Sequence, residues 1–409
     1  MNCRFCEHIL THEFVDLANS PASNSYLSAG QLNEPETFYP LKVFVCEKCW
    51  LVQIDEYKKS NAIFNGEYAY FSSFSTSWLA HAKAYTDLMM QKLNLNTKSL
   101  VIEVASNDGY LLQYFKEKNI PVLGIEPTAN TAEAAREKGI ETLVDFMSEK
   151  FAVELAVKKK KADLLLGNNV LAHVPDIIDF LKGMKTLLGE QGVITMEFPH
   201  VAQLIDNVQF DTIYHEHFSY LSFFTVKQML ESVGLIAFDV EELPTHGGSL
   251  RVYAAHKGDS SKKISANVEG LIAKELAVGI NKVSYYSNFQ SKVQKVKNDL
   301  LSFLLNQVKN NKTVAGYGAA AKGNTLLNYS GIKNDLIQYV VDANPHKQGK
   351  FLPGSHIPIV NEAHLKTTKP DYVIIFPWNL KEEIMSQLNY IRNWKGKFVI
   401  CLPQLSIIN

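Results

Sequence analysis

The sequence predicts an α/β protein in which two sheet-containing domains follow a small cysteine-rich module. Apolar stretches typical of strands alternate with helix-like stretches between residues 98 and 255, and again between residues 313 and 405. Alternation of this kind is typical of a parallel sheet covered by helices. Four of the five cysteines lie before residue 50 in two close pairs, which sets the N-terminal segment apart from the rest of the chain.

Length and charge restrict the class of protein. The chain has 409 residues, enough for two or three domains, and a formal net charge of −1. A near-neutral chain lacks the basic surface that binds phosphate backbones, so we expect no nucleic-acid partner. No segment reaches the ~18 consecutive apolar residues of a membrane span, and the N-terminus lacks the apolar run of a signal peptide. We therefore expect a cytoplasmic protein without a membrane partner, either a monomer or a small homo-oligomer.

The two cysteine pairs predict a metal site. Cys3 and Cys6 form one Cys-x-x-Cys motif, and Cys46 and Cys49 form a second one 39 residues later. Each motif turns two thiolates toward one point, and two motifs complete a tetrahedral set of four sulfurs for zinc. Because four protein ligands leave no open position, we expect a structural zinc, with thiol redox chemistry of one motif as the minor alternative. Cys401, in an apolar strand, is interpreted as a buried thiol without such a role.

The helix and strand patterns define the expected domains. Residues 1–70, the zinc-binding module, have few periodic runs and are expected to be irregular. Residues 71–257 are expected to form a central Rossmann-like domain that begins with a helix over 78–95. Residues 258–310 carry many polar residues among apolar ones and predict a long helical connector, before a C-terminal Rossmann-like domain at 311–409. The expected strands are 100–104, 122–125, 163–166, 192–197, 250–255, 313–317, 337–341, 372–376 and 398–402.

The first strand of the central domain ends in a turn that predicts a nucleoside site. Residues 100–109 run from an apolar strand into Ala-Ser-Asn-Asp-Gly, and an amphipathic helix follows. This turn lacks the complete G-x-G-x-x-G that lets a pyrophosphate approach the backbone, so a dinucleotide is only weakly supported. A methionine-bearing nucleoside has no phosphate, and a turn with Ala105 and Asn107 suffices for it. S-adenosylmethionine is therefore the expected cofactor.

Polar residues follow successive strands at one edge of the predicted sheet. Glu126 ends the second strand, about 20 residues after the turn, where an acid accepts hydrogen bonds from ribose hydroxyls. Asp145 offers an acceptor for the adenine amino group, and Phe146 offers a ring for its face. Asn168 ends the next strand, at the carboxyl edge where ligands bind in open α/β sheets. The expected cofactor residues are Glu103, Asn107, Asp108, Glu126, Asp145, Phe146 and Asn168.

A dense cluster of ionisable and aromatic residues at 210–220 is the candidate catalytic segment. Its spacing is not that of the H-E-x-x-H zinc proteases. In an irregular segment Tyr214, Glu216 and His217 can converge on one substrate, and a His beside a Glu can be tuned as a base. A hydrogen-bonded structural cluster is the alternative. His173, just past the expected cofactor edge, either faces the same pocket or is structural.

A second glycine-rich turn, at residues 314–325, follows a strand and opens a helix. Glycines and backbone amides at the start of a helix suit an anion, and Lys322 adds a positive charge. The turn completes neither a P-loop nor a dinucleotide fingerprint. We interpret it as a site for a phosphate of a nucleotide-linked substrate. The alternative is a degenerate second domain that only packs against the first.

Several motifs, taken in order and spacing, resemble those of the sugar C-methyltransferase family, whose members act on nucleotide-linked 4-keto-deoxysugars. The motifs that carry the resemblance over the whole chain are the two Cys-x-x-Cys pairs, Glu103 to Gly109, Tyr214 to Phe218, His246-Gly247-Gly248, Gly316 to Lys322 and Pro377-Trp378-Asn379. The resemblance implies that the central domain binds S-adenosylmethionine and that the C-terminal domain helps to hold the nucleotide-sugar. The expected substrate-binding residues are Tyr317, Lys322 and Asn379.

The resemblance also implies the chemistry. His217 matches the family's proposed base, and the residues implied to line the sugar site are Tyr214, Glu216, His173 and Tyr68. Tyr70 is the alternative to Tyr68. A ketone at C4 acidifies the proton on C3, a base removes that proton, and the enolate carbon takes the methyl group. No metal is needed at the reacting carbon, which agrees with a closed zinc site.

Three other functions are alternatives to methylation of a sugar carbon. O-methylation of a sugar hydroxyl needs the same cofactor and a similar base, and differs in not requiring a 4-keto group. A zinc-ribbon RNA methyltransferase is disfavoured by the near-neutral charge and by the lack of basic and aromatic residues interleaved near the cysteines. A non-catalytic scaffold is disfavoured by the dense cluster at residues 214–217.

Overall fold

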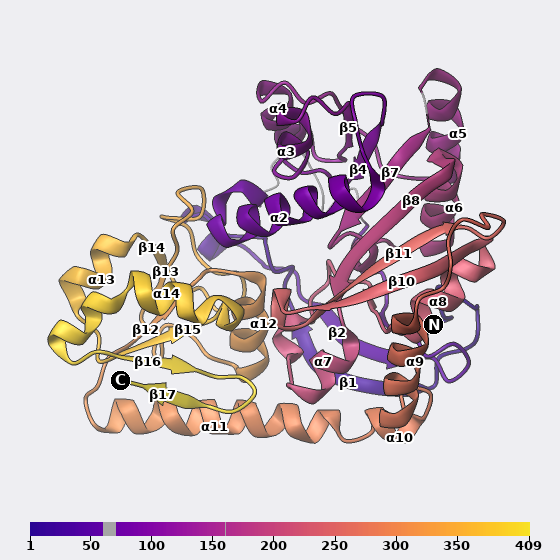
Figure 1. Ribbon diagram of the computed structural model, residues 1–409. Helices are drawn as coiled ribbons and strands as arrows, with labels where there is room; N and C mark the ends of the chain where they lie inside the picture. Colours follow the sequence, from indigo (N-terminus) through magenta and orange to yellow (C-terminus); the bar gives the residue numbers. More distant parts are fainter. Residues whose placement is uncertain (60–70, 160) are drawn as a thin grey trace.

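The structure, a computed structural model, describes residues 1–59, 71–159 and 161–409. The strands of this part of the chain form three sheets, of four, seven and six strands. In the view of Figure 1, the seven-stranded sheet lies at the upper right and the six-stranded sheet at the lower left, with α11 (Phe289–Lys309) running along the bottom and α2 (Thr76–Leu93) crossing the upper middle. The predicted α/β fold, with an N-terminal cysteine module and two sheet domains, is therefore confirmed.

The seven-stranded sheet has the strand order β10-β11-β8-β7-β4-β5-β6. Neighbours from β8 to β6 pair in parallel, whereas β11 is antiparallel to both β8 and β10. The strand order reverses between β4 and β7, where the carboxyl ends of parallel strands leave a crevice for ligands. A bulge interrupts the alternation in β10, which explains why the sequence pattern missed this strand. The strands are Val101–Val104 (β4), Val122–Ile125 (β5), Thr142–Leu143 (β6), Ala162–Asn168 (β7), Leu188–Pro199 (β8), Leu235–Leu243 (β10) and Ser249–His256 (β11).

Alternate residues of the central strands are buried on opposite faces of this sheet. Val101 and Leu164 pack against α2 and α3, whereas Ile102 and Leu165 pack against α5, α6 and α8. Burial on both faces explains why these strands are continuous apolar runs in the sequence. The helices are Leu112–Glu117 (α3), Ala129–Glu137 (α4), Glu149–Lys158 (α5), Ile177–Leu187 (α6), Val201–Asp206 (α7) and Phe223–Ser232 (α8).

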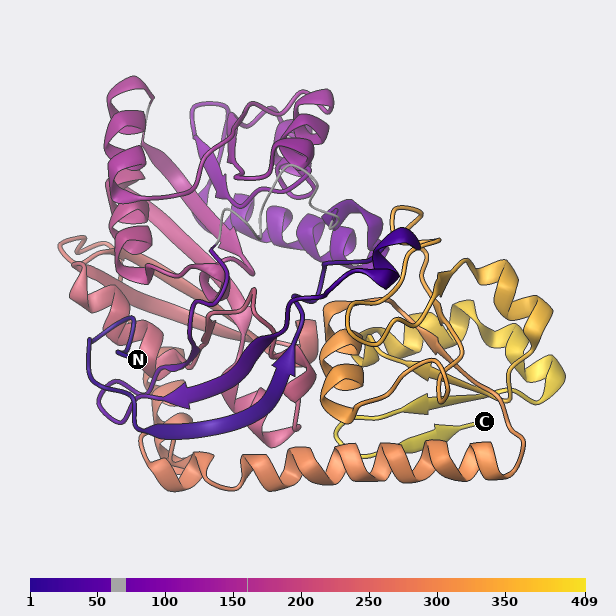
Figure 2. The ribbon, with the colours of Figure 1, turned by 180° about the vertical axis from the view of Figure 1, so that it is seen from behind.

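The N-terminal segment contains an antiparallel sheet, so the expectation of an irregular segment is wrong. Its strands β1, β2 and β3 pair in sequence order, and β3 also pairs with β9 from the candidate catalytic segment. Alternation is clear only in β2, where Leu41, Val43 and Val45 are buried. Register shifts after Glu13 and Asp16 break the period of two in β1. The strands are His12–Ser20 (β1), Tyr39–Val45 (β2), Val52–Ile54 (β3) and Ser219–Tyr220 (β9). Figure 2 shows β1 and β2 crossing in front of the central domain.

The six-stranded sheet, of order β14-β13-β12-β15-β16-β17, is parallel except for its last strand. Gly316 of β12 and Gly323 of α12 both pack against Phe376, and a Cβ at Gly316 would lie 2.5 Å from that ring. These glycines therefore allow a strand, a helix and a ring to pack closely. The elements are Val314–Tyr317 (β12), Val340–Val341 (β13), Ile359–Val360 (β14), Tyr372–Ile375 (β15), Lys397–Ile400 (β16), Ser406–Ile408 (β17), Ala321–Ser330 (α12), Glu362–Thr368 (α13) and Lys381–Gln387 (α14).

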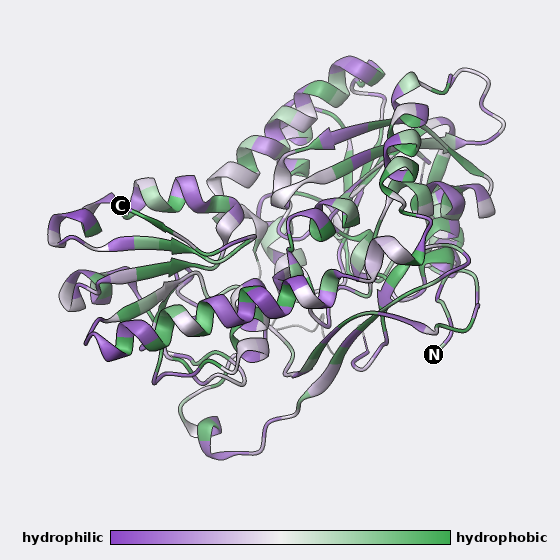
Figure 3. Cartoon of the chain, turned by 90° about the horizontal axis from the view of Figure 1, so that it is seen from below, coloured by the Kyte–Doolittle hydropathy of each residue, from purple (hydrophilic) through white to green (hydrophobic). Residues whose placement is uncertain are grey.

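Three helices, α9 (Ala266–Val278), α10 (Val283–Tyr286) and α11, link the two larger sheets. Helix α9 packs on β10 and α8, and α11 packs on α12 and β1. Both hydrophilic and hydrophobic residues lie along α11, whereas the strands of the sheets are mainly hydrophobic (Figure 3). None of the helices in the described ranges is long and apolar enough to span a bilayer.

Glu275 ties α9 to the central domain. Its buried carboxylate accepts hydrogen bonds from the backbone N–H groups of Phe223 (2.8 Å) and Phe224 (2.6 Å), where α8 begins. It also lies 2.7 Å from Nε2 of the buried His200. One acidic side chain thus satisfies two N–H groups at a helix N-terminus and one imidazole.

Replacing Glu275 with Ala is expected to lower the free energy of unfolding by about 3 kcal/mol, because it leaves these buried donors without an acceptor. Thermal unfolding followed by circular dichroism would show this as a lower melting temperature. Glu269→Ala, on the exposed face of the same helix, should leave the melting temperature near that of the wild type. Equal melting temperatures for the two variants would contradict the assignment.

Candidate active site and zinc centre

Four thiols meet near the N-terminus. Within 4.8 Å of one another lie the Sγ atoms of Cys3, Cys6, Cys46 and Cys49. The chain turns sharply after each pair, because Glu7 (φ 59°) and Trp50 (φ 65°) adopt left-handed conformations. Four converging sulfurs match the tetrahedral set that zinc requires, so these residues fit the predicted structural zinc.

The zinc module is joined directly to the candidate catalytic segment. The side chain of Arg4 donates to the carbonyl of Pro175 at 2.9 Å and lies 5.4 Å from the centre of the Phe218 ring. Strand β3 pairs with β9, which begins two residues after His217. Because Pro175 follows His173 closely, the cysteine turn holds the segments that carry both candidate histidines.

Polar groups converge where β4 and β5 end. Glu126 is buried, and its two carboxylate oxygens accept from the backbone N–H groups of Asn107 (2.8 Å) and Thr128 (2.9 Å). The side chain of Asn107 accepts in turn from the N–H of Ser72 at 2.9 Å. Asn107 has a φ of 49°, so the predicted nucleoside turn is a sharp one that Glu126 holds in shape.

This edge also carries buried groups that a ligand would satisfy. Asn168, at the end of β7, is 8% exposed, and neither its amide nitrogen nor its oxygen has a hydrogen-bond partner among the described residues. The same is true of the Ser106 hydroxyl. Burial, followed by the nearby charge of Glu126, raises the pKa of Glu103 well above its usual value. S-adenosylmethionine has a sulfonium, an ammonium and several polar groups, so its chemistry fits two buried acids and these unsatisfied atoms.

The remaining predicted cofactor residues differ in their surroundings. Asp145 and Phe146 are exposed just after β6, one strand beyond Glu126 in the sheet order. This position is open to a ligand bound along the carboxyl edge. Asp108 lies in the turn after β4 and pairs with Lys138 at 3.2 Å, so it also supports the turn.

His217 is partly exposed and has a defined tautomer. Its Nδ1 donates to the carbonyl of Thr212 at 2.9 Å, so Nε2 keeps its lone pair and accepts from the Tyr214 hydroxyl at 2.9 Å. Burial lowers the pKa of His217 well below its usual value, and the neighbouring His173 adds to this effect because two protonated rings would repel each other. Burial also lowers the pKa of His173 to about 4. Both imidazoles are therefore neutral at neutral pH.

Glu216 and His215 point to different surroundings. Burial raises the pKa of Glu216 to about 7, and its carboxylate accepts from the side-chain amide of Asn24 at 2.6 Å. The His215 ring packs against Tyr39 and its Nε2 donates to the carbonyl of Pro40 at 3.1 Å, in the N-terminal sheet. Of the predicted catalytic residues, the structure brings the side chains of His173, Tyr214 and His217 together, whereas the Glu216 carboxylate contacts Asn24. Tyr68, and Tyr70 as its alternative, lie outside the described residues.

Lys322 of α12 faces the central domain. Its Nζ donates to Asn379 at 2.6 Å and lies 4.7 Å from the Trp378 ring, whose Nε1 donates to Asp211 at 2.7 Å. Burial lowers the pKa of Lys322 to about 8 and raises the pKa of Asp211 to about 7. Two of the three predicted substrate residues thus meet at the domain boundary. Tyr317 does not join them, because its ring is buried in the core of the C-terminal sheet.

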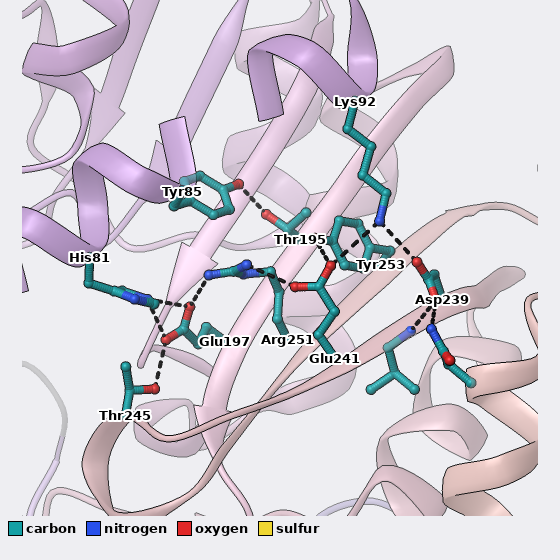
Figure 4. Close-up of polar contacts among 12 residues, drawn as sticks. His81, Tyr85, Lys92, Thr195, Glu197, Asp239, Glu241, Thr245, Arg251 and Tyr253 are labelled. Atoms are coloured by element: carbon teal, nitrogen blue, oxygen red, sulfur yellow. Dashed lines mark hydrogen bonds and ion pairs between the residues drawn. The ribbon is translucent and has the colours of Figure 1, made fainter. Parts of the chain in front are cut away.

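A buried polar network behind the cofactor edge has no counterpart in the sequence motifs. Near the end of β8, Glu197 accepts hydrogen bonds from His81 (2.9 Å), Thr245 (3.1 Å) and Arg251 (3.2 Å) (Figure 4). The guanidinium of Arg251 also donates to Glu241 at 3.0 Å. Burial acts to raise the pKa of Glu197, but the hydrogen bond from His81 and the nearby positive charges outweigh burial and lower it. Glu197 is therefore an anion. The partners come from α2, β10, β11 and the turn between the last two, so no local pattern could reveal them.

The sheet order, the sharp turn after β4 and the acid after β5 define a methyltransferase of the S-adenosylmethionine-dependent class. Residues 79–237 match the methyltransferase domain family, residues 3–64 match a zinc binding domain, and residues 244–403 match the C-methyltransferase C-terminal domain. The chain is 33% identical over 407 residues to C-methyltransferase NovU from Streptomyces niveus, covering 100% of this chain and 96% of that protein. The chain therefore belongs to the zinc-containing C-methyltransferase family and is an enzyme that uses S-adenosylmethionine.

Solved structures resemble part of the chain. The PH0226 protein from Pyrococcus horikoshii OT3 has a TM-score of 0.39 at 14% identity, covering 46% of this chain and 95% of that one. Magnesium protoporphyrin IX methyltransferase from Synechocystis PCC 6803 has a TM-score of 0.35 at 13% identity, covering 44% of this chain and 83% of that one. Membership of the family rests on the relative that matches the whole chain.

The purified protein is expected to contain about one zinc per chain, since the four sulfurs form one closed site. Cys46→Ser should lower both the zinc content and the melting temperature, because the metal contributes directly to folding. Cys401→Ser, at a buried thiol outside the cluster, should keep the full zinc content. Metal analysis beside thermal unfolding tests this. A zinc-free protein that melts like the wild type would refute the site.

Glu126→Ala is expected to weaken S-adenosylmethionine binding by about 1–3 kcal/mol, because the carboxylate holds the turn in which the cofactor is expected to bind. Isothermal titration calorimetry measures the change. Glu133→Ala, exposed on the neighbouring α4, is the matched control and should bind like the wild type. An unchanged dissociation constant for Glu126→Ala would remove this residue from the site.

Proposed function

We propose that this enzyme transfers a methyl group to C3 of a nucleotide-linked 4-keto-deoxysugar. The observation that carries the proposal is the neutral imidazole of His217, whose Nε2 lone pair faces the hydroxyl of Tyr214. Methyl transfer to carbon needs a carbon nucleophile, so a proton must first leave a carbon. A ketone beside that carbon acidifies the proton enough for an imidazole to remove it.

The same geometry suggests how His217 and Tyr214 act together. Nε2 of His217 takes the C3 proton, and the C–H electron pair moves into an enolate whose charge lies on the C4 oxygen. The Tyr214 hydroxyl, which donates to Nε2 in this structure, turns to donate to that oxygen and thereby uncovers Nε2. S-adenosylmethionine supplies an electrophilic methyl group to the enolate carbon. The carbonyl of Thr212 holds the imidazolium through Nδ1–H.

The nucleotide part of the substrate is assigned to the domain boundary. Helix α12, which carries Lys322, packs against the candidate catalytic segment, where the Thr325 hydroxyl donates to the carbonyl of Ile213 at 2.8 Å. The charge of Lys322 also contributes to the low pKa of His217, which supports a substrate that contacts both side chains. A diphosphate would add negative charge beside this largely buried ammonium, whose pKa is raised, among the described residues, by Asp211 alone. Asn379 keeps the ammonium oriented.

His217→Ala is expected to lower turnover by ~10²–10⁴-fold, the usual contribution of a general base. With a 4-keto nucleotide-sugar in deuterated water and S-adenosylhomocysteine in place of the methyl donor, the wild type should exchange the C3 hydrogen and the variant should not. Both ligands should still bind the variant. Mass spectrometry of product and of recovered substrate gives the two rates separately.

His215→Ala is the matched control, because His215 is the neighbouring histidine that faces the N-terminal sheet. It should keep its catalytic activity if it folds. Activity that survives in His217→Ala and is lost in His215→Ala would transfer the role of base to His215. A wild type that methylates a sugar hydroxyl and ignores 4-keto acceptors would refute the proposed reaction.

A further inference from the structure

His246 occupies a strained position beside the cofactor edge. It lies in the turn Thr245–Gly247 between β10 and β11, and its φ is 53°, a left-handed conformation that is unfavourable for a residue with a side chain. Gly247 and Gly248 follow it with φ values of 87° and 115°. Glycine would adopt this backbone conformation without strain, so a histidine at this position indicates a function for the imidazole itself.

The surrounding structure imposes this conformation. The Thr245 hydroxyl donates to Glu197 at 3.1 Å, and Gln209 donates to the carbonyl of Gly247 at 2.8 Å. A Cβ at Gly247 would lie 2.4 Å from the Trp378 ring, so the C-terminal domain closes the turn from the other side. Figure 4 shows Thr245 and His81 holding the same carboxylate, which anchors the turn to α2.

The imidazole of His246 presents one N–H group. Its Nε2 accepts from the side-chain amide of Asn169 at 3.1 Å, so the proton lies on Nδ1. The ring is partly exposed, lies 4.9 Å from that of Trp78, and has no acceptor for Nδ1–H among the described residues. Burial, and then the charge of Lys322, lowers the pKa of His246 to about 4, so the ring is neutral.

The Nδ1–H group of His246 lies near the expected sites of both the cofactor and the methyl acceptor. Asn169 follows Asn168 at the end of β7, so His246 adjoins the cofactor edge. Gly247, the next residue, packs against the Trp378 ring, and Nζ of Lys322 lies 4.7 Å from the centre of that ring. Lys322 and His246 also contribute to the low pKa of His217, which agrees with three groups that lie near one another. The N–H of His246 therefore lies between the cofactor edge and the cation assigned to the diphosphate.

We propose that His246 donates a hydrogen bond from Nδ1 to an oxygen of the methyl acceptor, and that Glu197 positions it through Thr245. For the acceptor's identity this inference rests on the proposed function. The oxygen belongs to the sugar or to the diphosphate, both of which offer the acceptor that a neutral imidazole N–H requires.

His246→Gly separates this role from a structural one. Glycine relaxes the left-handed turn, so the variant should melt at or above the wild-type temperature. The KM for the acceptor should nevertheless rise by ~10- to 100-fold, as expected for one lost hydrogen bond, with an unchanged dissociation constant for S-adenosylmethionine. His246→Gln, which keeps an N–H group of similar reach, should recover part of the loss. His364→Ala, exposed on α13, is the control with wild-type values.

Two further variants test the positioning role of Glu197. Thr245→Val removes the hydroxyl that links the turn to Glu197 and should raise the same KM by a smaller factor, whereas Thr245→Ser should restore it. In the double variant, adding Thr245→Val to His246→Gly should not raise the KM for the acceptor further, because both changes act through the same hydrogen bond to the acceptor. Additive effects on KM would overturn the positioning role.

The outcome that overturns the inference is a folded His246→Gly enzyme with a wild-type KM for the acceptor, or one that loses affinity for S-adenosylmethionine instead. The proposed function is decided separately, by which acceptor the wild type methylates. If that acceptor is a sugar hydroxyl, the 4-keto reaction fails, and the KM comparison for His246 is made on the acceptor that is used.

Discussion

The pairing of β3 with β9 is the constraint on which the candidate active site depends. Strand β3 follows the second cysteine turn directly, and β9 begins two residues after His217. The sulfur cluster therefore fixes a strand that fixes the catalytic segment, through main-chain hydrogen bonds that tolerate little displacement. Arg4, between the first two cysteines, adds a second link by contacting Pro175 and Phe218. The cysteine cluster thus helps to determine where His217, the proposed base, lies.

Three parts of the chain meet at this site, and each supplies a different chemical property. The central sheet offers buried acids and unsatisfied amides at its carboxyl edge, which suit a cationic cofactor. The N-terminal module supplies Asn24 to Glu216, and the C-terminal domain supplies Lys322. Burial moves the titratable groups toward their neutral forms, with the pKa of Glu216 raised to about 7 and that of His217 lowered. Such surroundings suit the proposed proton removal from carbon, because fixed donors such as the Tyr214 hydroxyl would then stabilise the developing enolate charge.

Local patterns predicted much of this arrangement. The cysteine spacing predicted a sulfur cluster that the structure brings within 4.8 Å, and the acid after the second strand predicted the position of Glu126 beside the nucleoside turn. The patterns failed where alternation is interrupted, as in the bulged β1, and where a residue near a motif serves packing, as Tyr317 does in the C-terminal core. They did not identify Asn24, which lies in no motif and donates a hydrogen bond to Glu216, 192 residues away in the chain.

By itself the sequence determined the fold class, the four clustered cysteines and the segments that carry the candidate cofactor edge and the candidate catalytic residues. These features depend on residues close together in the chain, whose spacing directly sets the geometry of a turn or a strand end. Only the tertiary structure decided that His217 rather than His215 faces His173, that Glu197 anchors the strained turn of His246, and that Lys322 approaches from another domain. Side-chain direction and burial are often set by partners that are distant in the chain, such as Asn24, 192 residues from Glu216, and the sequence pattern does not reveal such contacts.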